Sequence, residues 1–545
     1  MEQKNESGQK DFIILDKKDN VAVALKDMDI GDIISVAGDA AMDISDTIED
    51  INDTTVCDGK AERIKAGHKV AIRDIPKGEN IIKYGYPIGH ATCHISAGQW
   101  VHTHNARTNL HGILEYTYKC NTDCNIDCKT LVNSGDTGDK AFSSPDDNKA
   151  NPFTFKGYLR EDGNVGTRNE IWIINTVGCV NKTAEILARE ANRIFSNKIG
   201  QNFDGIFAFP HPYGCSQLGE DHFTTQKLLS ALAKHPNAAG ILVLGLGCEN
   251  NNIDEFKKIL DEKNKDRIRF LSTQDCEDEV SSGIKLIAEL IDYTAPFQRQ
   301  NCPISKLTIG FKCGGSDAFS GITANPLCGE FSDIILEQGG TTILTEVPEM
   351  FGAETILMDR CVNKDVFNKT VEMINGFKEY FIRHNQTIYE NPSPGNKEGG
   401  ISTLEEKSLG CILKGGSGAV ADVLKYADKV KKTGLNLLEG PGNDAVSITA
   451  LTAAGANLII FTTGRGTPLG APVPTIKVST TTDLYNRKGA WIDYNAGQLL
   501  ECKSIKSVAN DFFSFIISVA SGEIKTKNEI NCYREIAIFK DGITL

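Results

Sequence analysis

The pattern of apolar and polar positions changes twice along the chain, and each change marks a domain boundary. Over residues 12–118, short runs such as NVAVAL and HKVAIRDI are separated by Gly, Asp, Asn and Pro. Short β-rich runs with turn residues between them and few helical periods predict a small all-β domain. Residues 119–151 are rich in Asn, Asp, Ser, Lys and Gly, which predicts a polar linker.

From residue 152 onward the pattern becomes strand, loop and helix in repeated succession. The apolar runs IWIINTV, GIFAF and AGILVLGLG each lead into a segment with helical spacing. This alternation predicts a multidomain α/β protein with parallel, helix-covered sheets, in which ligands bind beyond the carboxyl ends of the strands. A polar break that contains NPSPGNKEGG divides the region. We therefore expect one α/β domain over residues 152–390 and a C-terminal α/β region over residues 391–545.

Length and charge narrow the class of protein. A chain of 545 residues is too long for one hydrophobic core, and its formal net charge of −14, without a basic stripe, argues against a nucleic-acid partner. The sequence has no apolar run of membrane-spanning length and its start has no signal-peptide core, so we expect a cytoplasmic protein without a membrane partner. Assembly into a homo-oligomer is left open.

The stretch GFKCGGSDAFSGITANP, at 310–326, is predicted to be an active-site loop. Its glycines let backbone N–H groups approach a ligand, and it follows an apolar strand. A connector without function is the alternative. The polar side chains that this loop offers are Lys312, Cys313, Ser316, Asp317, Ser320 and Asn325.

Four of the sixteen cysteines each come just after an apolar strand: Cys179, Cys215, Cys248 and Cys313. If those strands are neighbours, the four sulfurs share one edge of a sheet. Thiolates placed there could bind iron or an iron–sulfur cluster, or one or two of them could ligate a metal together with histidine or carboxylate. The alternative is that these cysteines are small fillers at crowded strand ends.

Two further patterns offer chemistry. His102 and His104 are two residues apart, and in an extended strand they would point to the same face, where they could share a metal or act as an acid and base pair. Arg465 stands between two glycines and could hold a carboxylate bidentately, with an ordinary turn arginine as the alternative.

A nicotinamide cofactor is disfavoured by the sequence. The closest match to a dinucleotide fingerprint has Gly245 and Gly247, but Asn250 occupies the position of the third glycine. We therefore expect no NAD.

Several long motifs together resemble the altronate and galactarate dehydratase family. They are GYPIGHA with VHTHN, GYLREDGNVGTRNEI, the cysteine-bearing strand ends, GGSDAFSGITANP and EGPGNDAVSITALTAAGANLIIFTTGRGTPLGAP. The resemblance covers nearly the whole chain from the β domain onward. It implies an N-terminal β-clip domain of the SAF type, a larger Rossmann-like α/β portion and dehydration of a hexonic or hexaric acid. It also implies a divalent metal, with Fe²⁺ expected and Mn²⁺ as the alternative, while an iron–sulfur cluster is less favoured.

Dehydration of a sugar acid makes demands that can be compared with the sequence. A base must remove a weakly acidic proton beside the carboxylate, an acid must assist the departing hydroxide, and a metal can stabilise the developing enediolate. The residues expected in catalysis are His102, His104, His211, Lys312 and Asp317. The residues expected to bind substrate are Arg168, Asn169, Ser316, Asn325 and Arg465. The expected metal ligands are His102, His104, Cys179, Cys215, Cys248 and Cys313.

The family resemblance favours D-altronate as substrate and 2-keto-3-deoxy-D-gluconate as product, with galactarate as the alternative substrate. A non-catalytic sugar-acid or metal-binding protein is the alternative from another class, because SAF-like domains also occur as binding modules. A redox protein that uses the strand-end cysteines is a third alternative.

Overall fold

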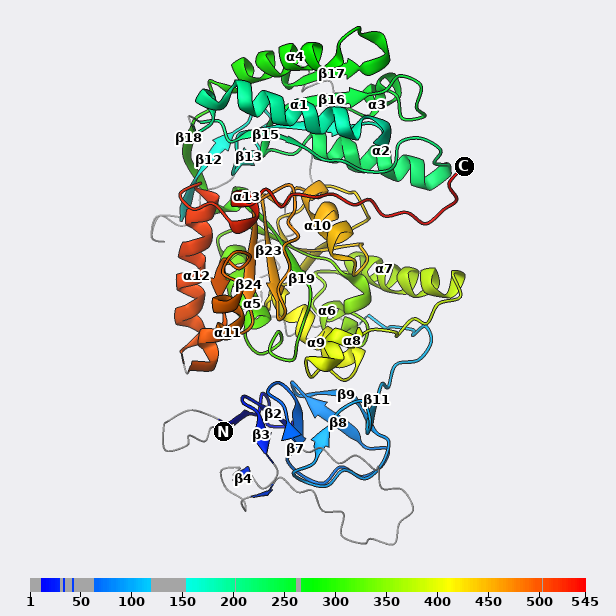
Figure 1. Ribbon diagram of the computed structural model, residues 1–545. Coiled ribbons are helices and arrows are strands. Elements are labelled where there is room, and N and C mark those ends of the chain that lie inside the picture. Colours follow the sequence, from blue (N-terminus) through cyan, green and yellow to red (C-terminus); the bar gives the residue numbers. More distant parts are fainter. Residues whose placement is uncertain are drawn as a thin grey trace.

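Figure 1 shows a computed structural model of the chain, in which three regions follow one another in space. The structure describes residues 11–29, 33–34, 42–43, 63–118, 153–200, 202–260, 266–501 and 503–545. The predicted linker at 119–151 lies outside these residues. No helix in the described part of the chain is long and apolar enough to cross a membrane.

The N-terminal region is all-β, as predicted, because its short strands pair with close neighbours in antiparallel fashion. One sheet has the order β1-β2-β7-β10 and a second has the order β11-β9-β8. Their bounds are β1 Phe12–Ile13, β2 Val21–Ala24, β7 Lys69–Ala71, β8 Asn80–Lys83, β9 Tyr86–Ala91, β10 Trp100–Val101 and β11 Ala106–Arg107. Two further antiparallel pairs join β3 (Met28–Asp29) to β6 (Arg63–Ile64), and β4 (Ile33–Ile34) to β5 (Met42–Asp43).

The second region is built on a four-stranded parallel sheet in the order β15-β14-β16-β17. The strands are β14 Glu170–Asn175, β15 Gly205–Ala208, β16 Ala238–Gly245 and β17 Ile268–Ser272. Side chains of β14 alternate between two cores, since Ile171 and Ile173 belong to one cluster and Trp172 and Ile174 to another. Helices therefore cover both faces: α1 (Asn181–Ile194) and α4 (Glu279–Thr294) on one, α2 (Gly219–Ala233) and α3 (Ile253–Ile259) on the other.

The third region holds a seven-stranded parallel sheet in the order β21-β22-β20-β19-β23-β24-β25. The strands are β19 Thr308–Cys313, β20 Thr341–Leu344, β21 Val420–Leu424, β22 Gly434–Leu438, β23 Leu458–Thr463, β24 Thr475–Ser479 and β25 Tyr494–Asn495. A small antiparallel sheet of β12 (Thr154–Leu159), β13 (Val165–Gly166) and β18 (Arg299–Pro303) precedes it in the chain.

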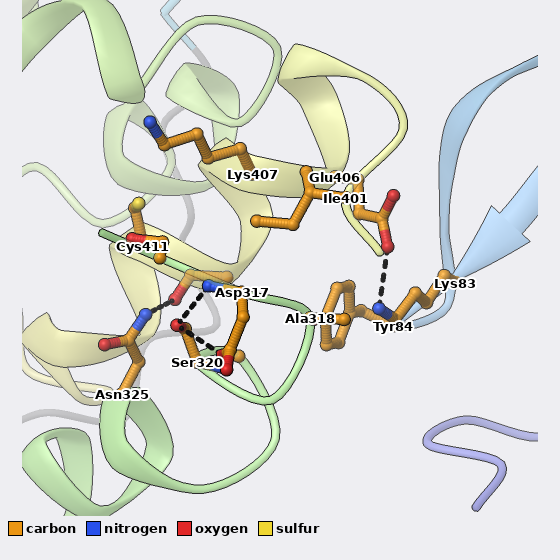
Figure 2. Close-up of a pocket in the computed structure, with 13 residues that line it drawn as sticks. Lys83, Tyr84, Asp317, Ala318, Ser320, Asn325, Ile401, Glu406, Lys407 and Cys411 are labelled. Carbon is orange, nitrogen blue, oxygen red and sulfur yellow. Dashed lines mark hydrogen bonds and ion pairs between the residues drawn. The ribbon is translucent and has the colours of Figure 1, made fainter. Parts of the chain in front are cut away.

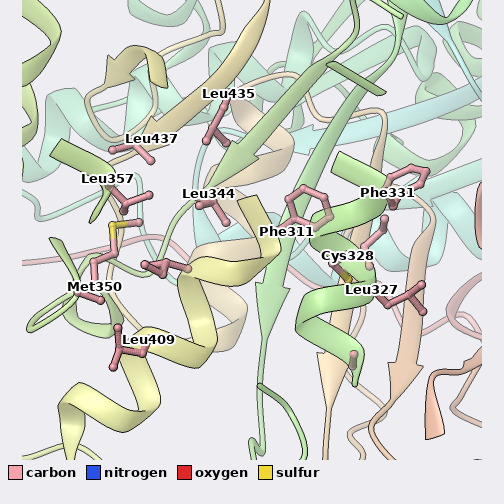
Figure 3. Packing of buried hydrophobic residues seen from close by; sticks show 14 of the residues in the cluster. Phe311, Leu327, Cys328, Phe331, Leu344, Met350, Leu357, Leu409, Leu435 and Leu437 are labelled. Carbon is pink, nitrogen blue, oxygen red and sulfur yellow. The ribbon is translucent and has the colours of Figure 1, made fainter. Parts of the chain in front are cut away.

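Helices close both faces of the seven-stranded sheet. Figure 3 shows Phe311 and Leu344 of the sheet packed near Phe331 of α5 and Leu409 of α9. The opposite face packs on α10, which also contacts α2 of the second region. The helices of this region are α5 Ala324–Glu337, α6 Glu354–Met358, α7 Lys364–Arg383, α8 Pro394–Glu398, α9 Leu404–Ile412, α10 Asp444–Ala453, α11 Thr482–Arg487, α12 Ile505–Ala520 and α13 Lys527–Ile530.

The predicted domain boundary between residues 390 and 391 is wrong. The strands β19 and β20 precede this point and the other five strands of the same sheet follow it. The polar stretch after residue 390 forms α8 and the start of α9, and it ends in buried residues that include Ser402 and Glu406. The stretch is polar because several of its side chains make buried hydrogen bonds within one domain. It is not a linker exposed to solvent.

Arg168 and Asn169 were expected to bind substrate, but the structure uses both internally. The Arg168 guanidinium, 1% exposed, donates to both carboxylate oxygens of Glu529 at 2.6 and 3.0 Å. Asn169 is fully buried, accepts from Arg160 and donates to the carbonyl of Thr294. These contacts fasten the start of β14 to its surroundings and leave neither side chain facing a cleft.

Replacing Arg168 with alanine is expected to destabilise the protein by about 3 kcal/mol or more, because Glu529 would keep a buried charge without its main partner. Urea denaturation measures this loss. The matched control is Arg193→Ala, which removes an exposed ion pair with Glu190 and is expected to cost less than about 1 kcal/mol.

The ion pair between Arg168 and Glu529 also predicts that the stability of the protein depends on pH. Burial acts to raise the pKa of Glu529, but Arg168 outweighs it and lowers that pKa from 4.5 to about 2. The stabilisation is therefore fully present above about pH 4.5 and is lost as the pH falls toward 2. The stability difference between wild type and Arg168→Ala should narrow over that range; a difference independent of pH would contradict the assignment.

Candidate active site

The carboxyl ends of β19 and β20 bring two thiols and a carboxylate together in the interior. Cys313 ends β19, Glu349 lies in the 3-10 helix η6 (Val347–Glu349) just after β20, and Cys411 lies in α9. The two sulfur atoms are 3.3 Å apart, and Glu349 Oε2 is 3.4 Å from Cys313 Sγ and 3.1 Å from Cys411 Sγ. We call these three buried residues the Cys-Glu-Cys cluster.

Three buried lysines surround the Cys-Glu-Cys cluster. Lys414 Nζ is 2.9 Å from Cys313 Sγ, and Lys407 Nζ is 2.9 Å from Glu349 Oε1. Lys312 forms an ion pair with Glu346 and lies 3.0 Å from Asp444 Oδ1, while Lys414 also contacts Glu346. Burial acts to raise the pKa of Glu349, but the three lysines lower it to about 2. Its carboxylate is therefore charged.

The charges around the cluster fit a divalent metal ion. Counted at their formal charges, the carboxylates of Glu346, Glu349 and Asp444 balance the three lysines. Ligating cysteines lose their protons, and two thiolates would balance a divalent cation. The three ligand atoms lie within 4.8 Å of one another, which is close enough for one ion. Thiolate with carboxylate suits iron or zinc better than calcium or magnesium.

Glu346 has an unusual backbone that places its carboxylate in this site. Its φ of 70° and ψ of 54° are in the left-handed region, which is uncommon for a residue with a side chain. In this conformation Glu346 Oε2 accepts a hydrogen bond from the Cys313 backbone N–H at 3.1 Å. The turn after β20 thus directs a carboxylate back across the end of β19.

A pocket lies between the β domain and the Cys-Glu-Cys cluster. Figure 2 shows Lys83 and Tyr84 reaching from the β domain toward Glu406, with Asp317 and Asn325 opposite them. Ser316, Ser320, Lys407 and Cys411 also line it. Its free volume is about 10 Å³, enough for about one water molecule. Because Cys411 belongs to both features, the pocket and the cluster form one site.

Buried charges join the β domain to this pocket. Lys69 and Lys83 each place their ammonium group 2.8 Å from a carboxylate oxygen of Glu406 on α9. All three side chains are at most 1% exposed. Burial acts to raise the pKa of Glu406, but the two lysines lower it to about 2, so the carboxylate is charged. The contact therefore sets where the β domain meets α9.

His102 and His104 lie at the same junction, but not as one face of a strand. The strand β10 ends at Val101, and the His102 carbonyl accepts from the N–H groups of Asn105 and Ala106, which makes a turn. His102 Nδ1 is hydrogen-bonded to Ser402 Oγ at 3.0 Å. The rings of both histidines contact Trp100.

The environment of His102 keeps its imidazole neutral. Burial lowers its pKa to about 3, with a further contribution from the charge of Lys69. The pKa of His104 is lowered by burial and by Arg107. Neutral imidazoles can accept a proton or ligate a metal, so both residues remain candidates.

The loop at 310–326 supplies polar groups to the pocket, and most of them also hold the loop in place. Asp317 accepts from the backbone and hydroxyl of Ser320 and from Thr480 Oγ1. Burial raises the pKa of its carboxyl. Asn325 donates to the carbonyl of Gly410 in α9, which fixes the loop against the helix that carries Cys411. Arg465 lies against Gly315 of this loop, outside the residues that line the pocket, and donates to the Gly395 carbonyl and to Glu398.

The structure separates the other predicted ligands from this site. Cys179, Cys215 and Cys248 follow the adjacent strands β14, β15 and β16, whereas Cys313 ends a strand of the other sheet. The expectation of one shared edge therefore holds for three cysteines and is wrong for Cys313. His211 lies with the three: its Nε2 donates to the Asn175 carbonyl and its Nδ1 accepts from the Tyr213 N–H.

Three family models match the chain. They are described as the SAF domain of altronate/galactarate dehydratase over residues 10–109, the second domain of D-galactarate dehydratase/altronate hydrolase over 157–295, and the C-terminal part of D-galactarate/altronate dehydratase over 304–544. The chain belongs to the altronate and galactarate dehydratase family. This assigns it to the hydro-lyases and confirms the family, the SAF domain and the enzyme class predicted from the sequence.

Relatives within the family match over nearly the full length. The altronate dehydratase of Bacillus subtilis is 47% identical over 98% of this chain and 100% of its own, and that of Escherichia coli is 45% identical over 98% and 100%. The galactarate dehydratase (L-threo-forming) of Escherichia coli is 32% identical over 88% of this chain and 90% of its own.

Sequence reasoning missed much of the site. Glu346, Glu349, Lys407, Cys411 and Lys414 were not identified, because they are spread over the chain and belong to no short motif. Only their positions along the chain gave a weak indication. Glu346 and Glu349 closely follow β20, and the other three residues lie in or just after α9.

Replacing Glu406 with glutamine is expected to destabilise the protein by about 3–5 kcal/mol, because it leaves two buried ammonium groups without a counter-charge. Protease sensitivity of the β domain and urea denaturation measure the effect. The control is Glu255→Gln, whose exposed pair with Lys258 contributes little. Equal stability of the two variants would show that the lysine contacts do not hold the β domain.

Proposed function

We propose that this protein removes water from D-altronate to give 2-keto-3-deoxy-D-gluconate. The observation that carries the proposal is the Cys-Glu-Cys cluster beside a pocket lined by polar residues of the 310–326 loop and the β domain. The higher identity to altronate dehydratases than to galactarate dehydratase supports altronate over galactarate. Galactarate stays the alternative substrate.

The proposed metal is Fe²⁺, with Mn²⁺ as the alternative, held by Cys313, Glu349 and Cys411. When bound, such an ion supplies Lewis-acid stabilisation of negative charge that develops on substrate oxygens. The lysines that pair with Glu346 and Glu349 hold these carboxylates in place. The rest of the chemistry falls to side chains that line the pocket and to the β-domain histidines His102 and His104.

Asp317 is the proposed base and Tyr84 the proposed acid. Both line the pocket, and burial raises the pKa of the Asp317 carboxyl toward the range in which a general base works near neutral pH. Burial also raises the pKa of the Tyr84 hydroxyl, so it keeps its proton until hydroxide departs. Lys407, Ser316 and Asn325 line the pocket and are the proposed partners of the carboxylate and hydroxyls, and Arg465, beside Gly315 of the 310–326 loop, is the proposed carboxylate clamp.

A six-carbon acid is much larger than the water-sized space in the pocket. Its entry therefore requires part of the pocket lining to move, and Lys83 and Tyr84 at the turn between β8 and β9 are the proposed moving part. The protein would then close on the substrate and exclude water, which strengthens electrostatic interactions in the site.

The decisive experiment is an anaerobic assay of 2-keto-3-deoxy acid formation from altronate and from galactarate, with and without added Fe²⁺. We expect product from altronate, iron dependence, and slower turnover of galactarate by at least about tenfold, which corresponds to about 1.4 kcal/mol. Preference for galactarate would overturn the substrate assignment. No product from any hexonic or hexaric acid would favour the non-catalytic binding protein.

The metal ligands can be tested apart from turnover. Cys411→Ser and Glu349→Gln are each expected to weaken Fe²⁺ binding by at least about tenfold, measured by anaerobic titration with a chelator as competitor. The control is Cys361→Ser, a partly buried cysteine outside the site. Unchanged affinity in both ligand variants would place the metal elsewhere.

The base is tested by Asp317→Asn, which is expected to lower kcat by about 10²–10⁴-fold and to remove the acidic limb of the pH–rate profile. Iron binding and the circular dichroism spectrum should stay as in wild type. Asp511→Asn, on the exposed side of α12, serves as the control. An Asp317→Asn variant that keeps the wild-type pH profile would exclude Asp317 as the base.

His102 and His104 are tested by a double replacement with alanine, which is expected to abolish metal-dependent turnover. Separate measurement of Fe²⁺ binding tells whether the loss arises from metal binding or from proton transfer. Near-normal activity of this double variant would remove both histidines from the mechanism.

A further inference from the structure

Three exposed cysteines outside the proposed active site lie at the carboxyl edge of the four-stranded sheet. Cys179, Cys215 and Cys248 follow β14, β15 and β16, and β14 is the middle strand of the three. The register pairs Ile173 with Ala208 and Asn175 with Leu244, so the three strands end at one edge. We call these residues the three-cysteine rim.

Hydrogen bonds tie the three cysteine-bearing loops into one unit. The Gly178 N–H donates to the Tyr213 carbonyl at 2.8 Å, and the Asn251 N–H donates to the Gly214 carbonyl at 3.0 Å. Asn251 Nδ2 donates to the Thr176 carbonyl at 3.0 Å, which links the third loop to the first. The thiol of Cys215 contacts Asn250 Oδ1 at 3.5 Å. The loops are thus held against one another rather than spread apart.

A glycine directly precedes each cysteine, and at two positions the close approach of the loops requires it. A Cβ on Gly178 would lie 2.8 Å from the His211 carbonyl oxygen. A Cβ on Gly214, whose φ is +98°, would lie 1.9 Å from the Thr176 carbonyl oxygen. This packing brings the backbones of the first two cysteines together, a constraint that unrelated surface thiols would not need.

Buried polar atoms beneath the loops also lack partners. Asn175 Oδ1 and Asn251 Oδ1 accept no hydrogen bond from the described residues, and both side chains are fully buried. Buried amide oxygens are normally satisfied by protein or ordered water. The neighbouring Glu249 carboxylate is already used, since it accepts from Thr176 Oγ1 and from the N–H groups of Leu246 and Gly247. Glu249 is therefore already occupied by hydrogen bonds, whereas the three cysteines at this edge are exposed.

The sulfur ligands of the three-cysteine rim limit which metals could bind there. Sulfur ligands favour zinc, copper(I) and iron–sulfur clusters. A single ion draws its ligands close together, but the set of three ligand atoms within 4.8 Å that the described residues contain is the Cys-Glu-Cys cluster. In a [4Fe–4S] cluster each cysteine binds a different iron, so the thiolates stand farther apart than around one ion. The three rim thiols do not form such a set among the described residues, so they suit a cluster better than a single ion.

We propose that the three-cysteine rim binds a [4Fe–4S] cluster. Such clusters usually have four cysteine ligands, so three leave one iron without a protein ligand. That iron would take an oxygen ligand of a small anionic molecule, such as a carboxylate or hydroxyl group, as a Lewis acid does. The proposal stands apart from the altronate assignment and from the metal at the Cys-Glu-Cys cluster.

The test uses the full chain, purified without oxygen and reconstituted with ferrous iron and inorganic sulfide. After desalting, we expect about four irons and four acid-labile sulfides per chain at the rim, with the broad visible absorption of a cluster. Cys179→Ser, Cys215→Ser and Cys248→Ser should each lower the sulfide content at least about tenfold. Because the three cysteines are exposed, these variants should keep the wild-type circular dichroism spectrum and thermal midpoint.

Two controls locate the cluster. Cys532→Ser alters an exposed cysteine in another part of the chain and should retain full sulfide content. Cys411→Ser removes a ligand of the other candidate metal site and should also retain it. Loss of sulfide in Cys411→Ser, iron bound without sulfide, or wild-type sulfide content in the three rim variants would each overturn the proposal. Altronate turnover is not a readout here, so failure of the proposed function leaves this test intact.

Discussion

The candidate active site depends on a set of buried charges at the ends of β19 and β20. Lys312, Lys414 and Glu346 are almost completely inaccessible, and each buried ion costs several kcal/mol unless a partner compensates it. The compensation works only in a narrow geometry, which explains why Glu346 adopts a left-handed backbone conformation. This network keeps two thiols and a second carboxylate, that of Glu349, within contact distance in the interior. A surface site with the same residues would not hold them so rigidly.

The helix α9 couples the two halves of the site. Glu406 on this helix binds the two lysines of the β domain, and Cys411, just over one turn later, belongs to the Cys-Glu-Cys cluster. A shift of the β domain would therefore act on a helix that also carries a candidate metal ligand. The 310–326 loop is fastened to the same helix through Asn325. The β-domain contact, the loop position and the candidate metal ligand Cys411 thus share one structural element.

The two thiol sites differ in chemistry as well as in location. The Cys-Glu-Cys cluster is buried and surrounded by lysines, whereas the three-cysteine rim is exposed and lies on a different sheet. Figure 1 shows the four-stranded sheet and the β domain at opposite ends of the seven-stranded region. A mixed thiolate and carboxylate set suits a single ion, and an all-thiolate set suits an iron–sulfur cluster. Both sites use the same feature of parallel sheets, the loops that follow the strands.

The sequence by itself determined the all-β and α/β regions, the alternating strands and helices of the second region and the family, because periodicity and long motifs are local properties. Only the tertiary structure decided that Arg168 pairs with Glu529, that Cys313 is separate from Cys179, and that residues on both sides of position 390 form one sheet. It also decided that Glu349 and Cys411, 62 residues apart, share a site. Local patterns show which residues an element buries, but which elements become neighbours depends on how whole sheets and helices pack.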